Sequence, residues 1–322
     1  MGDVVHALPV VHDILNAHPG AQIDWLVEEA YADIVRAHPG VRRVIPLALR
    51  RWRKNLFDAR TRQEWRAFWQ ALQRERYDAV IDLQGLVKSA LIARLARGPL
   101  YGLSWGSARE ALAPLFYAHR QKTALRRTEA AVPRYRDLAG WALRYTPIGK
   151  PQYGLSLQAE RPRWLPGVAP YVVLLSATAK DRKLWEEPRW IALGQALAAQ
   201  GRHCVFAWGN AAERARAQRL AAAVGDAQSA VDRQAASIAP KAFDLAQWMQ
   251  VLRAASAVVG VDTGLLFLAA AVGTPCVGIY VATSPVHVGI HAEGKHRNLG
   301  DIGRPPAASE VIDALTALMR PA

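Results

Sequence analysis

One short polar stretch of this sequence combines residue types that suit the binding of an anion. Asp262, Thr263 and Gly264 follow the strand-like apolar run 257–261 and open the apolar segment LLFLAAAV. A helix that starts there presents free N–H groups and the positive end of its dipole, both of which favour phosphate. Helix capping by Asp262 or Thr263 is the alternative. The stretch therefore predicts either a phosphate site or a plain cap.

Two other polar stretches follow strand-like runs in the same half of the chain. Thr178 and Lys183 come after YVVLL (171–175), and a hydroxyl beside a lysine suits a diphosphate. Glu213 follows RHCVFAW (202–208), where a carboxylate could accept hydrogen bonds from sugar or ribose hydroxyls. A solvated loop and an exposed helical glutamate are the alternatives. Both stretches stand where α/β proteins place their binding loops.

The other half of the chain contributes one carboxylate and a dense basic block. Asp3 follows Gly2 at the start of a helical pattern, and there it could act as a base at the edge of a cleft or simply cap the helix. Residues 42–66 hold nine Arg or Lys and two acidic residues, including RRWRK at 50–54. The net charge of +14 and the pI near 10.2 predict that the chain binds an acidic partner.

Alternating strand and helix patterns predict that these residues are carried by two α/β domains. A stretch rich in proline and glycine, 151–170, is predicted as a linker between domains 1–150 and 171–322. Each domain is expected to be a doubly wound, Rossmann-like layer structure, with a cleft between the two. Because such a domain normally begins with a central strand, the first strand is predicted to be missing ahead of Met1.

Several absences narrow the function classes. Cys204 and Cys276 lie in apolar runs without metal-ligand spacing, which predicts core residues in a reducing compartment. No G-x-G-x-x-G follows a strand and no P-loop motif occurs, which counts against dehydrogenases and P-loop NTPases. No D-x-D pair indicates a clamped metal, and no signal peptide or membrane-spanning run is present. A cytoplasmic protein without a metal site is predicted.

Six motifs occur in one order along nearly the whole chain: GDVVHALP (2–9), IDWLVEE (23–29), RRWRK (50–54), YDAVIDLQGLVKSA (77–90), WG-x-x-x-E (208–213) and VDTGL (261–265). Together they resemble the bacterial lipopolysaccharide heptosyltransferases. RRWRK with DLQGLVKSA resembles the heptosyltransferase I branch of that family.

The resemblance implies a GT-B fold and an inverting glycosyl transfer that needs neither metal nor cofactor. The donor would be ADP-heptose, and L-glycero-D-manno-heptose would pass to the Kdo of Kdo-lipid A during inner-core synthesis. Matching positions imply the following roles: catalytic base, Asp3; donor binding, Thr178, Lys183, Glu213, Asp262, Thr263, Gly264 and Leu265; acceptor binding, Arg50, Arg51, Arg53, Lys54, Lys88, Arg109 and Arg134.

The implied partners are ADP-heptose, Kdo-lipid A and the anionic surface of the inner membrane, on its cytoplasmic face. No oligomeric state is predicted. The family usually has histidine at the positions of Ser176, Phe267 and Ala130, so a weakened or inactive relative is one alternative. A basic nucleic-acid-binding protein is an alternative from another class, but no recognised nucleic-acid module is present, so nucleic acid is not a predicted partner.

Overall fold

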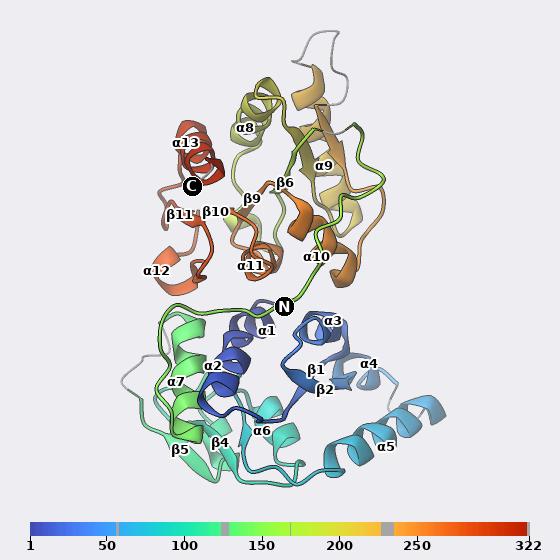
Figure 1. Cartoon of the computed structure of the whole chain (residues 1–322). Helices are drawn as coiled ribbons and strands as arrows, with labels where there is room; N and C mark the ends of the chain where they lie inside the picture. The colour runs from blue at the N-terminus through green and yellow to red at the C-terminus, as the bar shows by residue number, and fades with distance from the viewer. Residues whose placement is uncertain (56–57, 124–128, 168, 227–234, 321–322) are drawn as a thin grey trace. The chain divides into compact units, whose positions relative to one another are not determined.

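The computed structural model describes residues 1–55, 58–123, 129–167, 169–226 and 235–320, which fall into two compact units (Figure 1). Unit 1 comprises Met1 and Asp3–Gly154, and unit 2 comprises Gly2 and Leu155–Ala322. The boundary lies inside the stretch 151–170. Strands alternate with helices in both units, as the alternating patterns predict, and every strand pair within the sheets is parallel.

The described strands of unit 1 form two parallel sheets rather than one. β1 (Ile23–Glu28) pairs with β2 (Val41–Leu47), and β4 (Leu100–Leu103) lies between β3 (Val80–Ile81) and β5 (His119–Gln121). Side chains from the two sheets meet in one apolar cluster with helices of this unit. That cluster includes Ile23, Trp25, Ile81 and Leu83.

The helices of unit 1 surround these sheets. The helical pattern that begins near Asp3 is divided at Pro9, which lacks an N–H and therefore begins a new helix. The helices are α1 (Gly2–Ala7), α2 (Pro9–Ala17), α3 (Ala32–Arg36), α4 (Leu49–Trp52), α5 (Ala59–Gln73), α6 (Val87–Ala93) and α7 (Ala131–Leu143), with 3₁₀ turns η1 (Glu29–Tyr31) and η2 (Ala113–Phe116).

Unit 2 is built on one six-stranded parallel sheet. Its strand order is β11-β10-β9-β6-β7-β8, so the central strands are β6 (Tyr171–Leu175) and β9 (Ala257–Val261). The other strands are β7 (His203–Phe206), β8 (Ala236–Ile238), β10 (Cys276–Ile279) and β11 (His296–Leu299). Around the sheet lie η3 (Asp181–Lys183), α8 (Glu187–Ala199), α9 (Ala211–Asp226), α10 (Leu245–Ala254), α11 (Gly264–Ala271), α12 (Pro285–Val288) and α13 (Ala308–Met319).

The core of unit 2 explains why the sequence alone predicts its central strands. Every residue of β6, β7, β9 and β10 is buried, as expected for strands covered on both faces. Cys204 and Cys276 belong to this core as free thiols, which confirms their prediction as core residues. Burial raises the pKa of the Cys204 thiol to about 12 and raises that of Cys276 as well, so both stay protonated and unreactive.

Candidate functional site

The carboxyl ends of β6 and β9 form the centre of the candidate site in unit 2. These two strands are neighbours, and from them the sheet continues through β7 and β8 on one side and through β10 and β11 on the other. Ligands of open α/β sheets bind at such a reversal of strand order. The segment after β6 carries Thr178 and Lys183, and the segment after β9 carries Asp262 to Leu265. The predicted donor residues of both segments therefore stand at one edge.

The Asp262 side chain connects these segments through hydrogen bonds. Its side chain is 8 % exposed, and its Oδ2 accepts hydrogen bonds from Lys183 Nζ at 2.5 Å and from Thr283 Oγ1 at 2.9 Å. Thr283 follows β10, so three strand ends contribute to the cluster. Of the three N–H donors of Lys183, only this one is engaged within the described part of the chain. Two donors remain available to an anion.

The first turn of α11 lies directly beside this cluster. Thr263 occupies the N-cap position, but neither it nor any other described side chain caps the helix. Asp262 points its carboxylate to Lys183 and Thr283 instead. The structure therefore does not show the plain helix cap, and the first N–H groups of α11, including that of Gly264, keep the electropositive end of the helix open.

Of the remaining predicted donor residues, Glu213 has a structural role in unit 2. Glu213 stands in the first turn of α9, and its Oε2 accepts the Gly209 N–H at 2.7 Å, which closes the turn after β7. Thr178 is half-buried in the segment after β6. Ser176, which immediately follows β6, is 1 % exposed, and its hydroxyl has no hydrogen-bond partner among the described residues.

In unit 1, the predicted base Asp3 forms an ion pair with Arg109. The Arg109 guanidinium donates to Asp3 Oδ2 at 2.6 Å, and the side chains are 46 % and 38 % exposed. The hydrogen bond to Asp3 raises the pKa of Arg109, although partial burial opposes that shift. Two residues with separate predicted roles, base and acceptor ligand, thus contact each other.

A buried carboxylate, Asp82, holds the turn that packs against the backbone of Arg109, and Asp82 is not among the residues predicted for the site. Asp82 accepts hydrogen bonds from the backbone N–H groups of Gln84 and Gly85 and from the hydroxyls of Ser89 and Tyr117. Burial raises the pKa of Asp82 despite these donors. The sequence does draw attention to Asp82, because this residue is the first of the DLQGLVKSA motif.

The turn that Asp82 holds brings the backbone of Arg109 close. Gly85 has φ +66°, and a Cβ at this position would lie 3.1 Å from the Arg109 nitrogen. Glu110 locks the same contact, because its N–H donates to the Gly85 carbonyl and its Oε2 accepts the Val87 N–H. Gly85 is therefore required both by its backbone conformation and by this close approach.

The other predicted acceptor residues do not converge on one point. Arg51 pairs with Glu29 and Glu64, and Arg134 donates to the Ser107 carbonyl at 3.1 Å. The following residues are exposed, and none of them forms an ion pair within the described ranges: Arg50, Arg53, Lys54 and Lys88. Within the basic block, Arg50 and Arg51 lie in α4, and Arg53 and Lys54 follow its end.

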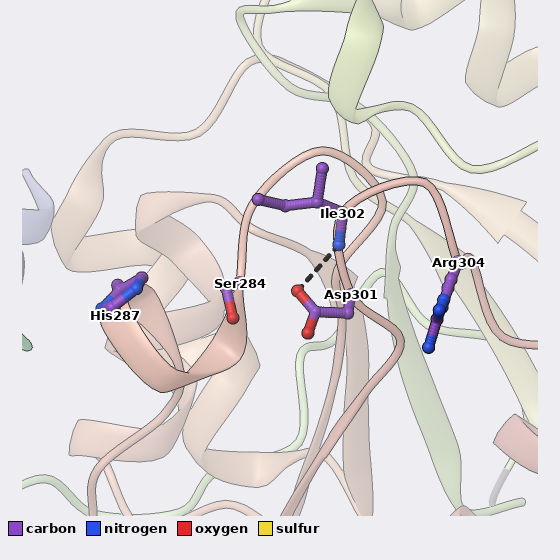
Figure 2. A pocket seen from close by; sticks show the side chains of 5 residues that line it. All are labelled: Ser284, His287, Asp301, Ile302 and Arg304. Atoms are coloured by element: carbon purple, nitrogen blue, oxygen red, sulfur yellow. Dashed lines mark hydrogen bonds between the residues drawn. The ribbon is translucent and has the colours of Figure 1, made fainter.

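A polar pocket of about 440 Å³ lies in unit 2. Figure 2 shows the Ser284 and Asp301 side chains between His287 on one side and Arg304 on the other. Ser284 directly follows Thr283, the hydroxyl partner of Asp262, so one lining residue of the pocket is next in sequence to the donor cluster. No motif predicts this pocket, because its walls come from two separate segments of the chain.

The chain is similar to proteins of one family over most of its length. The sequence model of glycosyltransferase family 9 (heptosyltransferase) matches residues 65–310. Lipopolysaccharide heptosyltransferase 1 of Pseudomonas aeruginosa is 41% identical over 297 residues, covering 92% of this chain and 80% of that protein. The protein of the same name from Escherichia coli K12 is 42% identical over 291 residues, covering 90% and 87%.

Solved structures agree with the sequence relatives. E. coli heptosyltransferase WaaC with ADP superposes with a TM-score of 0.85 at 37% identity, covering 99% of this chain and 97% of that one. WaaC with ADP-2-deoxy-2-fluoro heptose gives 0.78 at the same identity, covering 99% and 96%. E. coli ADP-heptose lps heptosyltransferase II, at 21% identity, shares the fold with a TM-score of 0.75 over 99% and 95%. The chain therefore belongs to glycosyltransferase family 9, the heptosyltransferases, and has their GT-B fold.

Proposed function

We propose that this chain transfers L-glycero-D-manno-heptose from ADP-heptose to the Kdo of Kdo-lipid A in the synthesis of the lipopolysaccharide inner core. The observation that carries the proposal is the cluster of Lys183, Asp262 and Thr283 beside the open first turn of α11. A 37% identical protein of the same fold has been solved with ADP and with an ADP-heptose analogue. The cluster offers the charges and donors that a diphosphate requires.

The donor side stabilises the leaving group. Two N–H donors of Lys183 and the first N–H groups of α11, around Gly264 and Leu265, bind the diphosphate. Asp262 holds Lys183 in place, so these charges are already oriented when negative charge develops on the departing ADP. Glu213 and Thr178 stand at the same sheet edge to contact the nucleoside.

The polar pocket receives the hydroxyl groups of the donor sugar. It adjoins Asp262 through Thr283, and it combines a hydroxyl, an imidazole, a carboxylate and a guanidinium. Such groups, Ser284, His287 and Asp301 among them, donate and accept hydrogen bonds in the mixture that a polyhydroxylated ligand needs.

On the acceptor side, Asp3 acts as the general base. It takes the proton of the Kdo hydroxyl as that oxygen bonds to the anomeric carbon, and the bond from that carbon to the ADP phosphate breaks. A single displacement of this kind inverts the configuration. Arg109 orients the Asp3 carboxylate before the acceptor arrives and then contacts the acceptor's own anionic groups. Arg50, Arg53, Lys54 and Lys88 supply further positive charge for a phosphorylated lipid.

No metal takes part in this proposal, since the charge of the leaving group is met by Lys183 and the helix. Among the described residues, no three His, Cys, Asp or Glu side chains are grouped as metal ligands would be. Within the same ranges, no helix combines the length and the apolar character needed to cross a bilayer. We place the chain at the cytoplasmic face of the inner membrane, because its acceptor is a lipid and its net charge is +14.

A calorimetric titration with ADP-heptose, ADP, UDP-glucose and GDP-mannose, followed by single-turnover transfer to Kdo-lipid A, tests the function. ADP-heptose and ADP should bind at least about tenfold more tightly than the other two, which is a difference of about 1.4 kcal/mol. Equal binding of all four would refute the donor assignment. Selective binding without transfer would instead identify a weakened relative.

A further inference from the structure

A second pocket lies within unit 1, between α4 and α5, and is called here the Trp–Arg pocket. Its volume of about 450 Å³ falls within the range of roughly 300–1,000 Å³ that small-molecule sites occupy. Its walls come from the facing sides of the two helices. They are Leu49, Trp52 and Arg53 from α4 and its end, and Thr61, Arg62, Trp65 and Arg66 from α5.

The floor of this pocket is apolar. The rings of Trp52 and Trp65 meet edge to face with centroids 5.5 Å apart, and Phe68 packs against both. The only polar atom of the Trp52 ring is already satisfied, because its Nε1–H donates to Glu64 at 2.7 Å. A ligand on this floor therefore needs hydrocarbon rather than hydrogen-bonding groups.

The rim carries positive charge that the described chain does not neutralise. Arg53, Arg62 and Arg66 are exposed, and none of them has an ion pair or a side-chain hydrogen bond among the described residues. Nearby acids are engaged elsewhere: Glu64 binds Arg51, Arg60 and Trp52, and Asp58 caps α5.

The spacing of two of these arginines also points to an absent anion. Arg62 and Arg66 are one turn apart on α5, where like charges repel each other slightly. An anion lying between them would remove this repulsion and gain two charge-assisted hydrogen bonds.

We propose that the Trp–Arg pocket binds one anionic membrane phospholipid, with an acyl chain against Trp52 and Trp65 and the phosphate on Arg62 and Arg66. A soluble anion would not use the apolar floor, and a neutral apolar ligand would not need the cationic rim. Tryptophan rings and arginines are well suited to this boundary between hydrocarbon and head groups. The inference goes beyond the proposed function, because this lipid is not the acceptor and is not consumed.

The test measures binding of the full chain to sedimented vesicles without donor or acceptor. Vesicles of phosphatidylcholine alone are compared with vesicles containing phosphatidylglycerol of the same acyl chains. The unmodified chain should prefer the anionic vesicles, and Arg62→Gln with Arg66→Gln should weaken that binding roughly 30-fold, as expected for two cations near a charged membrane surface. An unchanged affinity overturns the proposal.

The matched control is Arg76→Gln with Arg97→Gln. These two exposed arginines lie beside each other in unit 1, joined by an isolated β-bridge, and neither lines the pocket. The control removes the same net charge outside the pocket lining, where physiological salt screens exposed charges, so its effect should stay within about threefold. If the two double variants weakened vesicle binding equally, that binding would depend on net charge alone, and the pocket assignment would be overturned.

Two further arms separate the acyl chain from the phosphate, and this lipid from the acceptor. Lysophosphatidylglycerol below its micelle concentration should compete with the vesicles, whereas glycerol phosphate should not; equal competition would indicate a phosphate site alone. Transfer of heptose to a deacylated, water-soluble acceptor should change less than about twofold in the Arg62/Arg66 variant, since neither residue touches the reaction. A raised acceptor KM there would assign the pocket to the acceptor and overturn the inference, while leaving the proposed function intact.

Discussion

The two units each contain one acid–base pair among the predicted site residues, and the pairs differ in burial. In unit 2, Lys183 and Asp262 have side chains 18 % and 8 % exposed, and Thr283 adds a second hydrogen bond to the carboxylate. In unit 1, Arg109 and Asp3 are 46 % and 38 % exposed, with no further side-chain partner of Asp3 in the described ranges. One pair is enclosed by its own unit, and the other is open to solvent.

This difference indicates how each side of the reaction is prepared. A buried pair must recover the cost of removing two charges from water through good geometry and further hydrogen bonds, so it keeps one arrangement. Lys183 is therefore fixed before the donor binds. An exposed pair contributes little to stability and exchanges partners easily. Asp3 can therefore release Arg109 when the acceptor supplies a hydroxyl and anionic groups.

The largest expected effect comes from Asp3→Asn, which keeps the shape of the side chain but removes the base. The single-turnover rate of heptose transfer should fall by about 10²–10⁴, the usual contribution of a general base. ADP affinity, measured by calorimetry, should stay the same, because Asp3 and the donor cluster belong to different units. A rate within tenfold of the unmodified chain would show that Asp3 only holds Arg109.

Asp262→Ala should affect unit 2 in two ways. Removing one partner leaves the Lys183 ammonium without its counter-ion, which for a buried pair costs about 3–5 kcal/mol of unfolding free energy. Lys183 also loses its orientation, so ADP should bind on the order of tenfold more weakly or worse. Denaturant unfolding and calorimetry measure the two effects separately.

The double variant Asp262→Ala with Lys183→Met is the control for that experiment. It removes both charges, so much of the stability should return, while ADP affinity should stay low because the diphosphate has lost its lysine. If the double variant were as unstable as Asp262→Ala, the loss would come from Thr283 or from packing and not from the ion pair. Unchanged ADP affinity in Asp262→Ala would remove Asp262 from the donor site.

A smaller effect is expected from Arg53→Ala with Lys54→Ala. This double variant tests whether exposed basic residues of unit 1 bind the acceptor. Neither residue has an ion pair among the described residues, so both are available to a phosphorylated ligand. The acceptor KM should rise several-fold at low salt and less at high salt, because salt screens exposed charges. The donor KM should hardly change. An equal rise in both constants would contradict the division of roles.

The sequence predicted the central elements of unit 2 well and its edges poorly, for a physical reason. The apolar runs 171–175 and 257–261 coincide with β6 and β9, because a strand buried on both faces must be apolar throughout. β11 is HRNL and half-exposed at the sheet edge, so it carries no such pattern. β5 of unit 1 is likewise a short edge strand, HRQ, and carries no apolar pattern.

For the site, the sequence predicted residues but not their contacts. Asp262 and Lys183 were assigned to the donor, yet their ion pair depends on β6 and β9 being neighbours, which a linear pattern does not specify. Asp82 was missed because its role depends on donors from Gln84 through Tyr117, which only the fold brings together. Both pockets were missed for the same reason, since each is lined by two separate segments.

The smallest expected effect is that of Arg109→Gln on stability, and it sharpens the contrast with Asp262→Ala. Both variants break an ion pair that involves a proposed site carboxylate. Because the Arg109 and Asp3 side chains are each more than one-third exposed, water screens their attraction and solvates Asp3 once the arginine is gone. The free energy of unfolding should therefore fall by no more than about 1 kcal/mol. Denaturant unfolding of both variants under one set of conditions measures the contrast. If Arg109→Gln lowered the free energy of unfolding as much as Asp262→Ala, the exposed Arg109–Asp3 pair would stabilise the fold as strongly as the enclosed Lys183–Asp262 pair, and the contrast between the two units would be wrong.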